Sequence, residues 1–374
     1  MIDAYFDERG MPGVSTIMFK CPCCGGYLEF DAQLQKFKCL YCGQILTEQE
    51  LQEESARREE QADQAAPQAE RPAGEENASH EGESVPMKGY HCQMCGAEIV
   101  TEATTAATRC YYCHSPIVLQ DRLDDDFRPD GVIPFAMDKE AALREFMSYV
   151  SRKRFVDKSF FSEDQLEMFS GVYYPYWYFD VQGEAEFEGQ GTRRSVNTTP
   201  SYIITTTRFF AVARRGRAAF RNIARKALGK LDGKLSDGIH PFTPDGIRPY
   251  ASGYLSGFLA EKRDIEADAL QQDVVQEAGN YADTFIRCNH SFHSLTGSSA
   301  FRSTNVERRY VLLPVWVLTF KGGKDGAPYY YLMNGQTGRV CGKLPVDRGK
   351  LLRWAIAAGA IVAGLLTLGG KLLW

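Results

Sequence analysis

"FKCPCCGGYLEFDAQLQKFKCLYCG", residues 19 to 43, contains two Cys-x-x-Cys pairs, and "YHCQMCGAEIVTEATTAATRCYYCHSP", residues 90 to 116, repeats them with the same gap between pairs. Two residues between the cysteines let a tight turn direct both sulfurs at one ion, and two facing turns complete a tetrahedral thiolate site. The spacing therefore predicts two zinc ribbons, over residues 17–47 and 87–120. The eight predicted ligands are Cys21, Cys24, Cys39, Cys42, Cys92, Cys95, Cys110 and Cys113.

The residues beside these cysteines refine the prediction. Gly25, Gly43 and Gly96 each follow the second cysteine of a pair, where the turn needs a positive φ that glycine adopts without strain. His114 takes that place in the last turn, and we interpret it as an exposed turn residue in preference to an alternative ligand. Cys23, between two ligands, is interpreted as a spectator thiol. Four thiolates leave no position for water, so both zinc ions are predicted to be structural.

The charge of the chain limits the classes of function. Its 374 residues carry a formal net charge of −5, which gives no bulk attraction to nucleic acid. Neither ribbon has the clustered positive charge that phosphate binding requires, so a nucleic-acid-binding factor is kept only as the alternative to a protein-binding one. No N-terminal segment has the basic-then-apolar layout of a signal peptide, and the cysteine pattern indicates metal thiolates in a reducing compartment.

Residues 48–86, "EQELQEESARREEQADQAAPQAERPAGEENASHEGESVP", have no aromatic residue and few large apolar ones. Such a segment cannot bury enough surface to offset its conformational entropy. We expect a disordered or partly helical acidic linker between the ribbons.

An aromatic-rich α+β domain is predicted for residues 130–347. "GVYYPYWYFDVQGEAEFEGQG", residues 171–191, is typical of strand, with its glycines expected at turns. Two strands are expected around "GGKDG" (322–326), with "NGQTG" (334–338) as another tight turn. Apolar residues at helical spacing predict two helices: Ala142, Leu143, Phe146, Met147 and Val150 in the first, and Leu270, Val274, Ala278, Tyr281 and Phe285 in the second.

Two seven-residue segments of this domain resemble each other. "YYPYWYF" (173–179) and "LLPVWVL" (312–318) share one apolar pattern around a proline and a tryptophan, and each follows a predicted helix. This suggests a helix-plus-hairpin unit used twice. Because proline cannot donate a ladder hydrogen bond, Pro175 and Pro314 are predicted at strand starts or sheet edges.

The C-terminal residues 351–374 are predicted to form a transmembrane helix. Residues 354–370 carry no charge, Arg353 and Lys371 frame them, and Trp354 and Trp374 suit the two interfaces. The alternative is a buried or interfacial helix. More cations precede the segment than follow it, which predicts a single-pass protein of the cytoplasmic membrane with its bulk on the cytoplasmic side.

The remaining charged segments and possible catalytic motifs give weaker predictions of function than the cysteine pairs and the apolar C-terminal segment. Residues 208–235 contain nine Lys or Arg and one Asp, which predicts a solvated basic face or, second, contact with anionic lipid headgroups. "CNHSFH", with Cys288, His290 and His293, is interpreted as a polar loop in preference to a metal site. No phosphate-binding loop, nucleophile elbow or zinc-protease motif is present, so we expect no enzyme.

The ordered motifs resemble a known family, the YdjG-like bacterial membrane proteins with TFIIB-type zinc ribbons. The similarity rests on the paired ribbons followed by "VIPFAMDKEAA", "GVYYPYWYFD", "YLSGFLAEK", "LLPVWVL" and "MNGQTGRVCGKLPVD" before an apolar C-terminal segment. His114 and the linker depart from the family pattern. The resemblance implies a membrane-associated adaptor that works with SPFH-domain or PspA-type envelope-stress proteins.

Overall fold

The computed structural model describes most of the chain outside the predicted linker. The described residues are 16–17, 19–51, 53, 87–92, 98–102, 104–110, 115–119, 127–153, 155–156, 169–198, 203–230, 233–288, 291–321, 328–342 and 347–372. Cys95, Cys113, Gly96, His114 and His290, all named by the sequence analysis, lie outside these ranges, as do residues 54–86.

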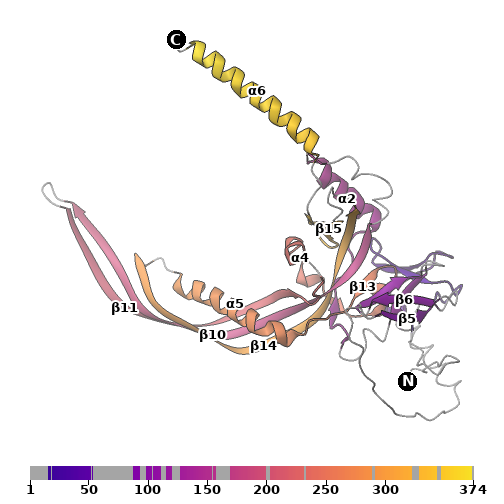
Figure 1. The fold of residues 1–374 in the computed structure, drawn as a ribbon. Helices are drawn as coiled ribbons and strands as arrows, with labels where there is room; N and C mark the ends of the chain where they lie inside the picture. The colour runs from indigo at the N-terminus through magenta and orange to yellow at the C-terminus, as the bar shows by residue number, and fades with distance from the viewer. Residues whose placement is uncertain are drawn as a thin grey trace.

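The fold mixes helices with a core that is mostly β-sheet, as Figure 1 shows. An eleven-stranded sheet runs in the order β1-β8-β7-β13-β10-β14-β15-β16, with β11, β9 and β12 attached beside this path. The first ribbon adds a three-stranded sheet, β2-β3-β4, and the second adds the pair β5-β6.

The elements have the following bounds. The strands are β1 Thr16–Ile17, β2 Leu28–Asp31, β3 Lys36–Cys39, β4 Ile45–Leu46, β5 Met87–His91, β6 Glu98–Glu102, β7 Thr105–Arg109, β8 Pro116–Leu119, β9 Gly131–Val132, β10 Ser170–Thr198, β11 Ile203–Lys226, β12 Arg248–Pro249, β13 Leu259–Glu261, β14 Ser294–Lys321, β15 Pro328–Asn334 and β16 Val340–Gly342. The helices are α2 Lys139–Ser151, α4 Gly233–Gly238, α5 Ala267–Arg287 and α6 Arg348–Leu372, with short 3₁₀ turns η4 Pro244–Gly246 and η5 Ser252–Leu255.

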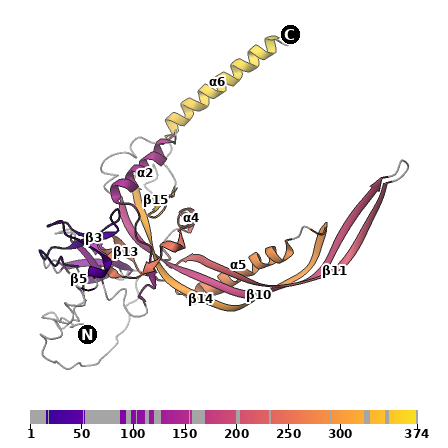
Figure 2. The same ribbon diagram turned by 180° about the vertical axis from the view of Figure 1, so that it is seen from behind.

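Three long strands form an arm that projects from the body of the molecule (Figures 1 and 2). β10 pairs antiparallel with β11 on one side and with β14 on the other, and α5 packs along this three-stranded ribbon. The glycines of β10 do not mark turns, contrary to the sequence prediction, because this strand is continuous through all of them. A Cβ at Gly189 would collide with the Thr296 carbonyl oxygen on β14, so the missing side chain permits close approach of neighbouring strands.

The two prolines lie inside long strands, not at strand starts or sheet edges. On the flank of β10 away from β14, β13 pairs with residues up to Tyr173 and β11 pairs from Tyr176 onward. Pro175 falls between these two partners. Pro314 of β14 has a similar position. β9 pairs with β14 up to Leu312, β15 pairs with β14 from Val315 onward, and Pro314 lies between these two partners. The prediction was wrong because a long strand can change partner along its length, and the missing N–H falls at that change.

The element order strand, helix, hairpin occurs twice, as β9-α2-β10-β11 and β13-α5-β14-β15. Both predicted helices are present. In α2 the buried residues are Ala142, Phe146 and Val150, as their spacing indicated. In α5 the burial differs from prediction, since Ala282 is buried while Tyr281 and Phe285 are exposed. The "NGQTG" turn is also confirmed, with Gly338 at a φ of 75°.

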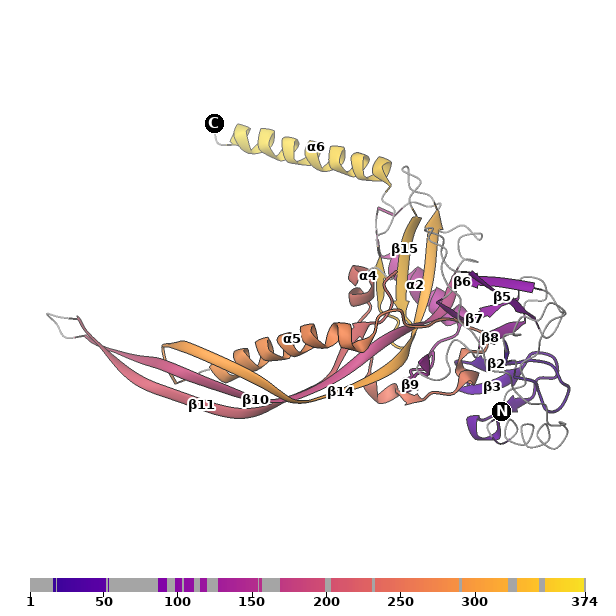
Figure 3. The same ribbon diagram turned by 60° about the horizontal axis from the view of Figure 1, so that its bottom comes forward.

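The first ribbon packs directly on the body instead of standing apart from it (Figure 3). Phe30 and Phe37 share the main hydrophobic core with Tyr254, and the ring centroids of Phe30 and Tyr254 are 5.1 Å apart. The N–H of Phe30 donates to the carbonyl of Ser256 at 3.1 Å. The second ribbon is also continuous with the body, because its β7–β8 hairpin joins the large sheet through β13. The first ribbon therefore packs on the body and the second pairs with it.

Candidate metal centre and adjoining cleft

The four cysteines of the first ribbon converge on one point. Their sulfurs all lie within 4.8 Å of one another, with Cys21 Sγ 3.6 Å from Cys42 Sγ and Cys24 Sγ 3.5 Å from Cys39 Sγ. A tetrahedral zinc site with Zn–S bonds of about 2.3 Å places sulfurs about 3.8 Å apart. The cluster therefore has the donors and the spacing that a structural zinc ion requires.

The backbone of both turns is shaped for this arrangement. Gly25 and Gly43 have φ angles of 72° and 75°, which confirms the conformation predicted for them. The N–H of Gly25 donates to the Cys21 carbonyl at 2.9 Å, and the N–H of Gly43 donates to the Cys39 carbonyl at 3.0 Å. A side chain at either glycine would strain the turn that directs the sulfurs inward.

The thiols of Cys39 and Cys24 differ in pKa. Burial raises the pKa of the Cys39 thiol, but hydrogen bonds from the backbone N–H groups of Cys42 and Tyr41 lower it, and the net result is about 7. The Gly26 N–H lowers the pKa of Cys24, yet the neighbouring sulfurs of Cys42 and Cys39 raise it to about 12. Cys24 therefore retains its proton at neutral pH, and a metal ion that binds its sulfur must displace that proton.

Only half of the second predicted site falls within the described residues. Cys92 and Cys110 are both buried, and Cys92 Sγ lies 3.5 Å from the hydroxyl of Ser115. The other two predicted ligands, Cys95 and Cys113, lie outside the described ranges. A second metal ion at this ribbon therefore stays a prediction.

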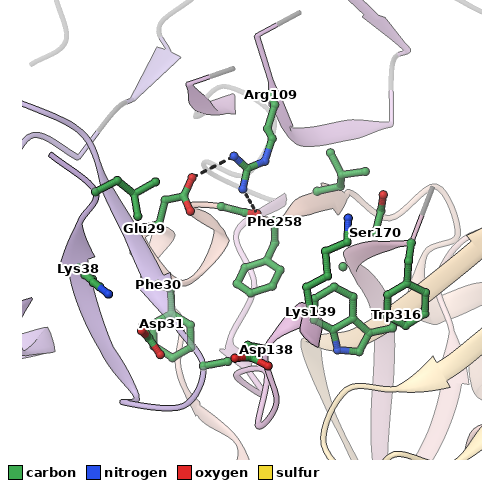
Figure 4. Close-up of a pocket in the computed structure, with 16 residues that line it drawn as sticks. Glu29, Phe30, Asp31, Lys38, Arg109, Asp138, Lys139, Ser170, Phe258 and Trp316 are labelled. Atoms are coloured by element: carbon green, nitrogen blue, oxygen red, sulfur yellow. Dashed lines mark hydrogen bonds and ion pairs between the residues drawn. The ribbon is translucent and has the colours of Figure 1, made fainter. Parts of the chain in front are cut away.

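A cleft of about 490 Å³ lies where the first ribbon meets the body (Figure 4). Glu29 and Lys38 come from the ribbon, Arg109 from β7, and Phe258 and Trp316 from the body. The guanidinium of Arg109 spans the junction, since it donates to Glu29 Oε1 at 3.0 Å and to the Gly257 carbonyl at 2.8 Å (Figure 4). One arginine therefore ties the two ribbons and the body together.

The apolar part of the cleft is held rigid by stacked rings. Phe258 stacks on Phe135 at a centroid distance of 4.2 Å, and Trp316 stacks on Phe169 at 5.2 Å. The indole Nε1 of Trp316 is buried and has no hydrogen-bond partner among the described residues. Neither Phe258 nor Trp316 was predicted as a site residue, although both lie in motifs that carry the family resemblance, "YLSGFLAEK" and "LLPVWVL".

Two other predicted features are placed by the structure. The helix α6 contains a segment, Gly349–Leu366, that is long and apolar enough to cross a membrane, with a mean hydropathy of 1.5 and none of it buried. Of the "CNHSFH" cluster, Cys288 is exposed at the end of α5 and His293 lies in the bend before β14. The basic residues 208–235 lie mainly on β11, along the exposed side of the arm.

The chain is similar over most of its length to one curated protein, the uncharacterized protein YdjG of Bacillus subtilis (strain 168). The two are 30% identical over 351 residues, which cover 93% of this chain and 96% of the relative. No protein-family model matches the chain. No solved structure matches it either.

Proposed function

Because the chain belongs to the YdjG family, we propose that it is a membrane-anchored, non-enzymatic zinc-ribbon adaptor that docks partner proteins on its first ribbon. SPFH-domain or PspA-type envelope-stress proteins are the partners that the family resemblance implies. The ribbon is the docking face, α6 is the anchor, and the bulk of the chain lies on the cytoplasmic side. Zinc at both ribbons holds the docking surface rigid.

The exposed apolar surface of the first ribbon carries this proposal. Its inner side chains pack on the body, yet Tyr41 is 66% exposed and Leu40 and Ile45 are exposed beside it. Tyr41 is held in place edge-on by Tyr27, at a centroid distance of 5.3 Å. Large apolar side chains kept rigid at a surface lose little entropy on association and are typical of the centre of protein interfaces.

The anchor and the arm support a location at the membrane. Large apolar side chains of α6, such as Ile356 and Leu366, are exposed along the helix, which is unfavourable in water and favourable in lipid. We propose that the arginines of β11 contact anionic headgroups, since Arg215 and Arg217 lie on an exposed edge of the arm. Each such cation contributes about 1 kcal/mol near an anionic surface.

The test is recruitment of candidate partners to membranes by the full-length protein. Tyr41→Ser combined with Ile45→Ser removes exposed apolar surface and keeps all four cysteines and the side chains of the packed face of the ribbon. Tyr330→Ser, at an exposed tyrosine of β15, is the matched control. Crosslinking followed by purification from membranes measures how much SPFH-domain or PspA-type protein accompanies each variant.

We expect the double variant to stay in the membrane fraction and to lose most of the bound partner, while the control retains it. Deletion of residues 351–374 should release the chain from membranes and abolish recruitment. The docking role is wrong if the double variant recruits as well as the unaltered chain. The anchoring role is wrong if the truncated chain still sediments with membranes.

A further inference from the structure

We propose that the arm tip is a second membrane contact, which inserts apolar side chains at the headgroup level of an anionic bilayer. The arm tip is the hairpin end formed by residues 193–198 of β10 and residues 203–208 of β11. The inference rests on the proposed anchoring of the chain by α6, and it adds a reversible contact at a distance from that helix.

The arm tip is a two-stranded hairpin that no other described element covers. β14 pairs with β10 only as far as Thr192, and α5 ends at Arg287, so the tip extends beyond both (Figure 1). The side chains that the structure describes in the tip are all exposed. Because an isolated two-stranded hairpin is marginally stable in water, this one gains from a surrounding that covers it.

Large apolar side chains are exposed on both faces of the arm tip. Ile203 is 72% exposed, Val196 56% and Ile204 53%. Directly paired residues share a face of a sheet, and Val196 pairs with Thr205 while Asn197 pairs with Ile204. Val196 and Ile203 therefore lie on one face and Ile204 on the other. A protein surface would cover one face of such a hairpin, whereas a lipid layer surrounds both.

The outer part of the arm carries no negative charge that would repel an anionic surface. No Asp or Glu occurs in residues 189–231, which include all of β11, or in residues 284–306, which include the part of β14 that lies along the outer arm. Nearer the body the arginines have acidic partners, as Arg302 has in Glu184 at 3.1 Å. The outer arm therefore differs from the rest of the arm in its charge.

Two arginines supply the positive charge of the arm tip. Arg194 and Arg208 are exposed, and neither makes an ion pair or hydrogen bond within the described part of the chain. Since Arg208 pairs with Arg193, it lies on the face opposite Arg194. Each face thus combines an exposed apolar residue with a cation that can bind a lipid phosphate. Apolar side chains beside cations are what binding to an anionic bilayer requires.

The backbone of the arm tip limits how far it enters the bilayer. Within the described structure, the outer edges of both strands are unpaired beyond Thr192. Unpaired N–H and C=O groups are not stable in hydrocarbon, so the tip does not cross the membrane. The arginines stay among the phosphates while the isoleucines reach the boundary between headgroups and acyl chains.

The placement of the arm tip relative to α6 fits a contact with one membrane. Figures 1 and 3 show that the arm and α6 extend from the same side of the body. Because α6 holds the chain at the bilayer, the tip acts at a high effective concentration, and a few side chains suffice for the contact. A second point of attachment would fix the orientation of the body, and of the first ribbon with it, relative to the membrane.

The experiment measures contact between the arm tip and lipid in the full-length protein, reconstituted alone into vesicles. A fluorescent amino acid is introduced in place of Asn197 in the tip or, as a control, in place of Glu188, which lies about 30 Å nearer the body on the same strand. The vesicles contain phosphatidylcholine and phosphatidylglycerol, with a nitroxide on some acyl chains close to the headgroup. We expect the nitroxide to quench most of the fluorescence at position 197 and little of it at position 188.

Removal of the apolar side chains tests insertion. Ile203→Thr with Ile204→Thr deletes apolar surface and keeps the β-branched shape that a strand favours. Quenching at position 197 should then fall to the level seen at position 188. Phe285→Ala is the matched control, because it removes an apolar side chain of the arm that is 71% exposed but lies on α5, and quenching should persist.

Removal of the cations tests the choice of lipid. Arg194→Gln with Arg208→Gln should lower the ratio of inserted to free tips roughly thirtyfold in anionic vesicles, as expected for two cations near such a surface. The same variant should have little further effect in vesicles of phosphatidylcholine alone. Arg302→Gln, at an arginine paired within the arm, is the control and should leave the ratio unchanged.

Several outcomes overturn the proposal. Equal quenching at positions 197 and 188, or full quenching in the isoleucine variant, refutes insertion by the tip. Loss of quenching in Phe285→Ala refutes it as well, because the arm would then lie flat on the bilayer. Protection of the fluorophore from iodide without quenching by the nitroxide lipid, increasing with protein density, would place a second copy of the chain against the tip.

The failure of this contact can be told from failure of the proposed function. An unquenched tip in a chain that stays in the vesicle and recruits its partner refutes only the contact of the arm. A quenched tip in a chain that recruits no partner refutes only the adaptor function and supports the arm contact.

Discussion

Truncation of one ribbon side chain should detach the first ribbon from the body without unfolding the sheet. Phe37 is 1% exposed and packs against Phe30 and Tyr254, with ring centroids 5.4 and 5.9 Å apart. Replacing a buried Phe by Ala costs about 3–5 kcal/mol because the cavity refills only in part. We therefore expect Phe37→Ala to lower the free energy of local opening of the ribbon by that amount.

Hydrogen exchange measures this opening strand by strand. Since each 1.4 kcal/mol is a factor of ten, amides of β2 and β3 should exchange roughly 100- to 4,000-fold faster in Phe37→Ala. Amides in the middle of β10 and β14 should be unchanged. Leu34→Ala, at a ribbon residue that is 47% exposed, is the control and should leave all rates within a few-fold. Equal acceleration in β10 and β14 would refute the idea that the ribbon opens separately, and no acceleration anywhere would show that its packing contributes no stability.

Four further outcomes are expected. Gly189→Ala should destabilise the arm by several kcal/mol, because the new Cβ would collide with the Thr296 carbonyl oxygen. Gly216→Ala is the control and should be neutral or slightly stabilising, because no atom lies within 4 Å of its added Cβ. Thermal unfolding compares the two variants. Asn334→Asp should cost at least about 3 kcal/mol because the buried amide donates to the carbonyls of Ile239 and Pro241 at 3.0 and 3.2 Å. The stability of that variant should recover as pH falls, because a protonated carboxyl regains one donor; denaturant titrations at several pH values check this. Cys21→Ser should remove one equivalent of zinc by elemental analysis, and loss of zinc from the unaltered chain should increase as the pH falls. DNA and RNA should show no steeply salt-dependent retention by the full-length protein in nanodiscs, and micromolar, salt-sensitive binding would instead favour the nucleic-acid alternative.

Local chemistry in the sequence was sufficient to predict the four-cysteine cluster of the first ribbon and the helices α2 and α5. Cys-x-x-Cys spacing determines the sulfur geometry within a few residues, and the positive φ of Gly25 and Gly43 follows from the turn itself. The helical spacing of Ala142, Phe146 and Val150 likewise depends only on neighbours along one helix. These predictions succeeded because the determining contacts are close in sequence.

Features that depend on distant strands could not be predicted. A glycine at a turn and a glycine at a close strand crossing look alike in sequence, which is why Gly189 was misassigned. The placement of Pro175 depends on where β13 ends and β11 begins, and no pattern in the sequence shows that. The cleft could not be predicted either, because Lys38 and Trp316 come to line it together only when the ribbon packs on the sheet.

The exchange of short strands between the two repeated units has a consequence for how the chain is made. β9, from the first unit, pairs with β14 of the second, and β13, from the second, pairs with β10 of the first. Neither unit can therefore complete its own sheet. On the ribosome, the first unit must wait until β14 has emerged, and the apolar helix α6 emerges only after that. The body can therefore fold before α6 has been made, and a chain that stops before the end of β14 lacks both α6 and a finished sheet.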